Sequence, residues 1–202
     1  MAAAIGLSAE ITLPSIISDN MVLQQKADAK LWGWGEPGEK IEIRTSWGKK
    51  VYSTHADADG KWSVYVKTPG HCTGQWVKVS SGRTGETVEI SNVLVGEVWM
   101  ASGQSNMEFE MMPHRKDTWM TGMYNWEEEA ADAEYPNIHL FKVEEDWDHN
   151  VVRDNCKGEW VVCSPEVAKT YSAIAFLFAR ELHRELHRPV GVILCAFGGT
   201  HA

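Results

Sequence analysis

The sequence predicts a mixed α/β protein in which a small all-β unit precedes the first part of an α/β layer domain. In residues 13–92, short alternating apolar and polar runs recur about every ten positions, separated by turn residues. From residue 93 onward, long apolar strands and a helix with a period of about 3.6 residues take over. Charge follows the same division, because residues 1–93 carry ten Lys and Arg against ten Asp and Glu, whereas residues 94–202 carry nine against eighteen.

The first unit consists of short strand candidates. Apolar and polar residues alternate within them, as in Ile41-Glu42-Ile43-Arg44, and clusters of glycine, proline, serine or aspartate stand between them. Strands of this length and spacing predict a β-sandwich or jelly roll over residues 13–92. The candidates are residues 29–34, 40–46, 50–56, 61–66, 75–80 and 87–90.

One turn of this unit, Asp57-Ala58-Asp59-Gly60, carries the first carboxylates of a calcium loop. The later ligands and the closing glutamate are missing from it, so a tight hairpin turn is the favoured interpretation.

The second unit, residues 93–202, is expected to be an incomplete α/β domain. Strands are predicted at residues 93–101, 138–143 and 190–197. Ser164 and Pro165 together form a helix-start signal. In residues 172–187, apolar side chains recur at three- and four-residue spacing, which predicts a helix that covers the sheet with one apolar face. This predicted face consists of Ile174, Leu177, Phe178, Leu182 and Leu186.

The four cysteines lack the spacing of a metal site. Cys195 lies in an apolar strand and is expected to be a buried, inert thiol. Cys156 and Cys163 bracket a short segment, so they either pair, if the protein is exported, or stay free.

The stretch Gly103-Gln104-Ser105-Asn106-Met107 directly follows the first apolar strand of the second unit. A serine in this frame lifts its hydroxyl above the edge of a sheet, and the next backbone N–H groups point at the group that the hydroxyl attacks. We therefore expect Ser105 to be a nucleophile; an ordinary polar turn is the alternative.

A second stretch, Gly198-Gly199-Thr200, directly follows the last apolar strand, so it is expected at the same edge of the sheet as Ser105. An ester hydrolase needs N–H donors aimed at the developing oxyanion, and glycine permits the close backbone approach that this requires.

Residues 96–108, Gly-Glu-Val-Trp-Met-Ala-Ser-Gly-Gln-Ser-Asn-Met-Glu, resemble the nucleophile block of the sialate O-acetylesterase family. These proteins are SGNH-type carbohydrate esterases, related to one class of acetylxylan esterases. Further similar stretches are residues 13–25, 172–182, 189–191 and 197–200, so the resemblance covers most of the chain.

The resemblance implies a serine esterase that removes acetyl groups from sugars, either sialic acid or xylan-type sugars, with no metal and no cofactor. The fold implied is an SGNH (flavodoxin-like) three-layer hydrolase domain. Ser105 would attack the acetyl carbonyl, and the N–H groups of Ser105 and Gly199, with Gly198 as fallback, would hold the oxyanion. The residues expected at the substrate pocket are Gln104, Asn106 and His201.

Two further blocks of the family are not found within these 202 residues. In the family, one supplies an oxyanion Asn and the other, of the form Asp-x-x-His, supplies the base and its orienting acid. We expect both from the remainder of the hydrolase domain, as further sequence or as a second chain. Residues 1–12 are interpreted as a cloning tail or a signal remnant, and the latter would indicate a secreted or periplasmic protein.

Several other residues compete for a functional role. Asp146-Trp147-Asp148-His149 also reads Asp-x-x-His, but it follows the strand at residues 138–143, much earlier than the family's block. His201 is an equally weak candidate for the base. His183 and His187 lie four apart on a helix without a third ligand at suitable spacing, which favours a solvated face over a metal site.

Three tryptophans, Trp119, Trp126 and Trp147, either stack on sugar rings or pack in a core or an interface. The net charge of −9 argues against nucleic acid and anionic membranes as partners, and no apolar run approaches the ~20 residues of a membrane span. The class that competes with the esterase is a non-catalytic carbohydrate-binding or interaction module, favoured by the β-rich first unit and the ten Trp.

Overall fold

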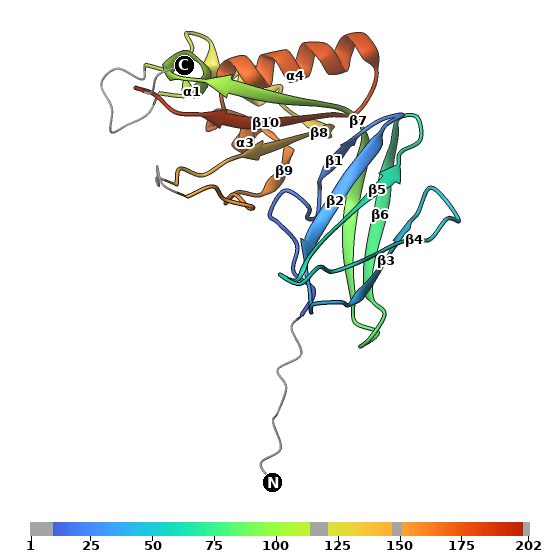
Figure 1. The fold of residues 1–202 in the computed structure, drawn as a ribbon. Coiled ribbons are helices and arrows are strands. Elements are labelled where there is room, and N and C mark those ends of the chain that lie inside the picture. The colour runs from blue at the N-terminus through green and yellow to red at the C-terminus, as the bar shows by residue number, and fades with distance from the viewer. Residues whose placement is uncertain (1–9, 114–120, 147–150, 200–202) are drawn as a thin grey trace.

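The computed structural model describes residues 10–113, 121–146 and 151–199. It is a mixed α/β structure whose two parts share one long strand, β7 (Thr87–Gly103), drawn in green in Figure 1. The first half of β7 pairs antiparallel with β6 (Cys72–Ser81), and its second half pairs parallel with β10 (Val190–Ala196). A single sheet of eight strands therefore runs through both parts, in the order β4-β3-β6-β7-β10-β8-β9, with β1 (Val22–Gln24) beside β7.

The sequence predicted two separate strands, residues 87–90 and 93–101, where the structure has this one strand. The backbone changes direction at Asn92, which has a φ of 50°, a conformation that asparagine tolerates better than most residues. The Asp19 carboxylate accepts hydrogen bonds from the backbone N–H and the hydroxyl of Ser91 at 2.7 and 3.0 Å. Ser91 and Asn92, whose polar side chains predict the end of a strand, therefore stabilise a kink within a continuous strand.

The first part contains two sheets that face each other. The larger one includes β3 (Lys40–Thr45) and β4 (Tyr52–His55), and the smaller one pairs β2 (Asp28–Trp34) with β5 (Lys61–Lys67). Inward side chains of both sheets form one core, because alternate residues of a strand point to the same face. Fully buried members of this core are Leu31, Ile41, Ile43, Val66, Val77 and Val79.

The turn at residues 57–60 is not a hairpin, because β4 pairs with β3 and β5 pairs with β2. It crosses from one sheet to the other. One carboxylate oxygen of Asp57 accepts the backbone N–H groups of Asp59 and Lys61, both at 2.9 Å, so this carboxylate closes the turn.

The second part contains β8 (Tyr135–Lys142), which is parallel to β10, and β9 (Trp160–Cys163), which is antiparallel to β8. Its helices are α1 (Ser105–Glu108), α2 (Trp126–Ala131), α3 (Pro165–Lys169) and α4 (Ala173–Leu186). The hydroxyls of Ser164 and Ser172 cap α3 and α4 by accepting the N–H groups of Val167 and Ala175. None of the helices in the described ranges is long and apolar enough to cross a membrane.

The two faces of the sheet in this part are covered differently. Ile138 and Leu140 of β8 point toward α3 and α4 and lie in a second core, whereas Phe141 lies in the first core. On that opposite face, the buried ring of His139 donates from Nδ1 to the carbonyl of Asn20 at 2.5 Å. The described residues place no helix on this face, which packs against the amino-terminal segment.

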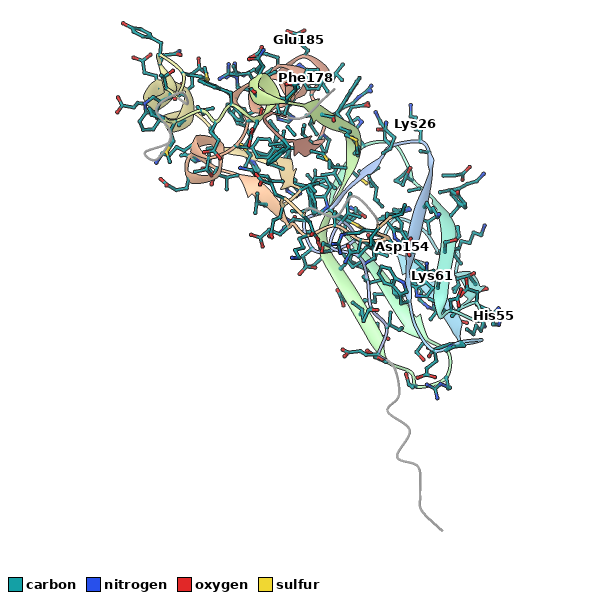
Figure 2. All side chains as sticks on the ribbon, turned by 60° about the vertical axis from the view of Figure 1, so that its left-hand side comes forward. Lys26, His55, Lys61, Asp154, Phe178 and Glu185 are labelled. Carbon is teal, nitrogen blue, oxygen red and sulfur yellow. The ribbon has the colours of Figure 1, made fainter. Side chains whose placement is uncertain are left out.

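Helix α4 buries a face that differs from the predicted one. The small residues Ala173, Ala175 and Ala179, with Phe176, face the sheet, since alanines let a helix approach β10 closely. The predicted stripe is largely exposed: Ile174 by 50%, Phe178 by 42% and Leu186 by 40%. Figure 2 labels Phe178 on the outer side of this helix. The helix therefore has two apolar faces, and periodicity alone could not indicate which of them is covered.

The exposed stripe continues onto β7. Trp99 is half exposed and meets Phe178 edge to face, with their ring centroids 5.3 Å apart. Next to it, Met100 is 67% exposed. On this side of β7, the backbone groups of Met100 and Ser102 have no strand partner in the described part of the chain, because β1 ends its pairing at Gly96.

The thiols also differ from expectation. Cys195 is exposed, because it points away from the helices at the end of β10, where the described residues leave the sheet uncovered. Cys156 and Cys163 both carry free thiols. Cys163 is buried on β9, where burial raises the pKa of its thiol to about 12, and its Sγ contacts the carbonyl of Ala133 at 3.5 Å.

A surface ion pair joins the segment before β9 to the sheets of the first part. Lys61 on β5 and Asp154 in the segment before β9 form an ion pair with a 2.5 Å separation, and both are labelled in Figure 2. Both side chains are about half exposed, so this pair contributes little to stability.

Candidate active site

Ser105 begins α1 directly after β7 ends, so the end of the strand sets its position. It is half-buried, whereas its neighbours Gln104 and Asn106 are exposed. The turn is closed by the Gln104 carbonyl, which accepts the N–H groups of Met107 and Glu108 at 2.9 Å each. The backbone N–H of Ser105 meets no acceptor among the residues that the structure describes, so it is available to a ligand.

The glycine turn after β10 lies beside Ser105. The N–H of Phe197 donates to the carbonyl of Gly103, which keeps the ends of β10 and β7 together. A Cβ atom at Gly198 would lie 3.5 Å from the Ser105 hydroxyl oxygen and only 2.5 Å from a carboxylate oxygen of Glu108, so a side chain here would displace the Glu108 carboxylate. The two stretches that the sequence placed at one sheet edge are therefore adjacent in space.

The two glycines of this turn differ in their hydrogen bonding. The N–H of Gly198 donates to Oε2 of Glu108 at 2.7 Å, so it is already engaged. The N–H of Gly199 has no partner within the described ranges, and its φ of 81° is a conformation that side-chain-bearing residues rarely adopt. This difference favours Gly199 over Gly198 as an oxyanion donor.

Glu108 is a residue of this site that the sequence analysis did not single out. It follows Ser105 by three positions, one turn along α1, and joins the turn that carries Ser105 to the glycine turn. The spacing was a usable signal, because a carboxylate one helical turn after a strand-end serine lies next to that serine.

If Ser105 is the nucleophile, as the sequence predicts, replacement of Glu108 by alanine should lower kcat of the complete protein about tenfold, whereas KM should change less. The N–H of Gly198 then has no carboxylate to hold it, so the N–H of Gly199 no longer points at the oxyanion. Glu108→Gln keeps an acceptor oxygen for Gly198 and should retain most of kcat. Steady-state kinetics on an acetylated sugar measures both constants. Equal losses in the two variants would contradict the anchoring role.

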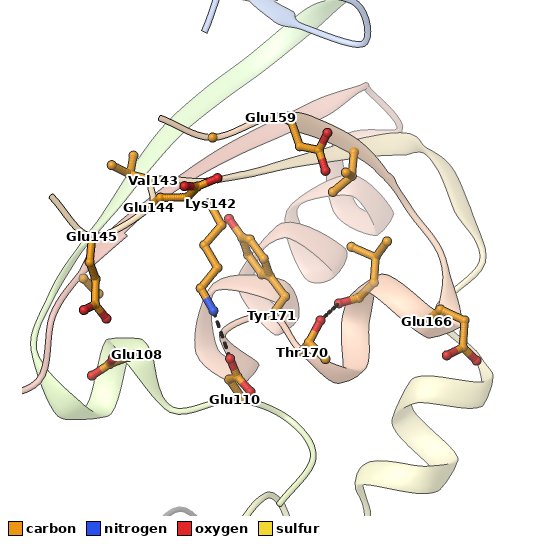
Figure 3. A pocket seen from close by; sticks show the side chains of 14 residues that line it. Glu108, Glu110, Lys142, Val143, Glu144, Glu145, Glu159, Glu166, Thr170 and Tyr171 are labelled. Atoms are coloured by element: carbon orange, nitrogen blue, oxygen red, sulfur yellow. Dashed lines mark hydrogen bonds and ion pairs between the residues drawn. The ribbon is translucent and has the colours of Figure 1, made fainter. Parts of the chain in front are cut away.

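A cavity of about 860 Å³ adjoins this site, bounded by Glu108 and by the ends of β8 and β10 (Figure 3). Among its lining residues, Lys142 forms an ion pair with Glu110 at 2.9 Å, drawn as a dashed line in Figure 3. Tyr171 closes the cavity floor, and its hydroxyl donates to the carbonyls of Phe141 and Val192. Burial raises the pKa of this phenol far above its ordinary value, so it stays neutral.

The structure does not bring the competing polar residues to Ser105. Asp146 forms an ion pair with Arg153 at 3.1 Å, and His149 lies outside the described residues. His183 donates from Nδ1 to the carbonyl of Arg188 at 2.6 Å, and His187 ends α4 in a left-handed conformation. No group of three metal ligands occurs in the described ranges.

The three tryptophans do not line the cavity as far as the structure describes them. Trp126 begins α2 and packs, half-buried, against the second core. Trp119 and Trp147 lie outside the described residues, as do Thr200 and His201.

Comparison with known proteins identifies similar proteins that are named as carbohydrate acetylesterases. No model of a protein family matches the sequence. Sialate O-acetylesterases from Homo sapiens and Pongo abelii are each 29% identical to it over 92% of the chain, and that of Mus musculus is 28% identical over 93%. The chain spans 36–37% of the length of these relatives.

Among solved structures, a carbohydrate acetylesterase from Xanthomonas citri superposes with a TM-score of 0.85 and 28% sequence identity. The match covers 95% of this chain and 41% of that protein. Sequence similarity and fold thus agree over nearly the whole chain, and both support a relationship to the sialate O-acetylesterase family.

Proposed function

We propose that this chain supplies the nucleophile of a serine esterase that removes O-acetyl groups from carbohydrates. The observation that carries the proposal is the meeting of Ser105 with the Gly198-Gly199 turn at the carboxyl ends of two parallel strands. The names of the relatives, sialate O-acetylesterase and carbohydrate acetylesterase, support the same chemistry. Sialic acid and xylan-type sugars are the substrate candidates.

The reaction follows from the groups at this edge. The Ser105 hydroxyl attacks the acetyl carbonyl carbon and gives its proton to a base, and the negative charge moves to the carbonyl oxygen. The N–H groups of Ser105 and Gly199, both without acceptors in the described part of the chain, stabilise that oxyanion. The sugar oxygen then leaves with the proton, and water hydrolyses the acetyl-serine. Gln104 and Asn106 flank Ser105, and we propose that these exposed side chains contact the sugar, although neither lines the cavity that Glu108 bounds.

The base and its orienting acid are proposed to come from the remainder of the hydrolase domain, as further sequence or as a second chain. Support comes from the length of the relatives and from the unpaired side of β7 beyond Gly96. Residues 93–202 would then be the first part of an SGNH three-layer domain, of which the remainder forms the missing layer, and residues 13–92 a small β-sandwich domain. Secretion or a periplasmic location remains part of this proposal.

The alternative, a non-catalytic carbohydrate-binding module, is favoured by one observation: none of the described His or Asp residues contacts the Ser105 hydroxyl. Acetate release from acetylated sugars by the complete polypeptide separates the two functions. The esterase should release acetate with multiple turnovers and form a transient acetyl-serine in Ser105's peptide. Sugar binding without acetate release would instead establish the binding module.

A further inference from the structure

We propose that the cavity beside Ser105 selects acetylated sugars without a carboxylate and disfavours anionic sugars such as sialic acid. This inference rests on the proposed esterase function and names its substrate class. It departs from the substrate in the names of the curated relatives, since the walls of this cavity carry the charge that a sialic acid also carries.

The cavity is placed to receive the sugar that leaves Ser105. Glu108 lines it and also accepts the N–H of Gly198, and a Cβ atom built on Gly198 would lie 3.5 Å from the Ser105 hydroxyl oxygen. Ala196, the last residue of β10, lines it as well, so the cavity opens at the strand end where the acetyl group reacts. Its volume of about 860 Å³ lies within the range of small-molecule sites, so it holds at least one sugar ring.

The charged side chains that line the cavity are predominantly acidic. Six glutamates line the cavity, and Lys142 is the single lysine or arginine among its lining residues. Figure 3 shows these side chains around the opening. The ammonium group of Lys142 is already paired with Glu110, whose side chain is only 14% exposed. Among the lining residues, no cation is therefore left over for a substrate carboxylate.

Three of the glutamates, Glu144, Glu145 and Glu159, have no ion pair within the described ranges. A carboxylate that enters the cavity meets these like charges and loses part of its hydration, and both effects oppose binding. A neutral sugar meets acceptors only, and its hydroxyl groups are donors that carboxylates accept in charge-assisted hydrogen bonds. The apolar side chains of Val161 and Val167 offer a surface for the C–H groups of the ring.

The test compares 9-O-acetyl sialic acid with the methyl ester of its carboxyl group, which removes the charge and keeps the ring and the acetyl group. With the complete enzyme in about 0.01 M salt, where the Debye length is about 30 Å, kcat/KM should be about tenfold or more higher for the methyl ester. In about 1 M sodium chloride, where the Debye length falls to about 3 Å, the preference should shrink severalfold. An acetylated neutral xyloside should behave like the methyl ester at both salt concentrations.

Charge variants localise the effect. Glu145→Gln combined with Glu159→Gln should raise kcat/KM for the free acid severalfold more than for the methyl ester, because two like charges leave the wall. Glu185→Gln makes the same kind of change on the exposed end of α4, outside the cavity, and should leave the ratio unchanged.

Equal kcat/KM values for the two esters, or a preference that high salt leaves unchanged, would overturn the proposal while the esterase function stands. Acetate release from none of the substrates would overturn the esterase function instead. In that case, calorimetric binding of the free acid and its methyl ester still tests the cavity, with weaker binding of the acid expected and equal binding contradicting the proposal.

Discussion

The complete enzyme with Ser105→Ala is expected to lose acetate release by on the order of 10⁴-fold or more in kcat, because no acetyl-enzyme can form. KM should change little, since the methyl group of alanine leaves the backbone N–H of residue 105 in place. The matched control is Ser102→Ala, which removes an exposed hydroxyl three residues earlier on β7 and should retain nearly full activity. Initial rates on an acetylated neutral sugar measure all three proteins.

Covalent labelling gives an independent readout of the same assignment. A serine-directed phosphonate should modify the peptide that contains Ser105 in the complete enzyme and in Ser102→Ala, and it should leave Ser105→Ala unmodified. The expected selectivity comes from the base and the oxyanion donors, which activate one hydroxyl among many exposed serines. Labelling that persists in Ser105→Ala would remove this residue from the nucleophile position.

The strands of the first part could be predicted closely from sequence, because each has one buried and one exposed face and so alternates. The register of Ile41 and Ile43 toward the core is a direct example. The same logic missed β1 and β9, which have three and four residues and are too short for a pattern to be significant. The prediction also divided β7 into two strands, because Asn92 is typical of a turn. In the structure, Asp19 and Asn20 bind Ser91 and Asn92 and keep this segment within one strand.

The sequence could predict those residues of the candidate site whose positions follow from the order of the strands. Ser105 and Gly199 each follow a parallel strand, and parallel strands end at one edge. The spacing of Glu108 from Ser105 could have placed it near that serine, but its contact with the N–H of Gly198, 90 positions away, leaves no local pattern. The error on α4 has a related cause: whether Phe176 or Phe178 is covered depends on how many strands flank β7, a property of the whole domain.

The exposed apolar stripe of α4 and the open side of β7 also decide how residues 1–202 should behave when they are produced alone. The side of β7 beyond Gly96 offers the N–H and C=O groups of Met100 and Ser102 without a strand partner in the described ranges. Beside it lie Trp99, Ile174 and Phe178, all large and about half exposed. An open strand edge flanked by a large apolar patch is a template for association.

We therefore expect residues 1–202 alone to aggregate, or to combine a folded sandwich with a loosely packed α/β half, and to hydrolyse p-nitrophenyl acetate no faster than buffer does. Hydrogen exchange should show protected amides in β3 and β6 and fast exchange in β8 and β10. Phe178→Lys offers a reciprocal check: it should improve the solubility of the isolated chain and destabilise the complete enzyme, since the same surface is exposed in one and covered in the other. A monomeric, cooperatively folding and active protein of 202 residues would contradict this, and it would return Asp146 and His149 as the candidates for the catalytic acid and base.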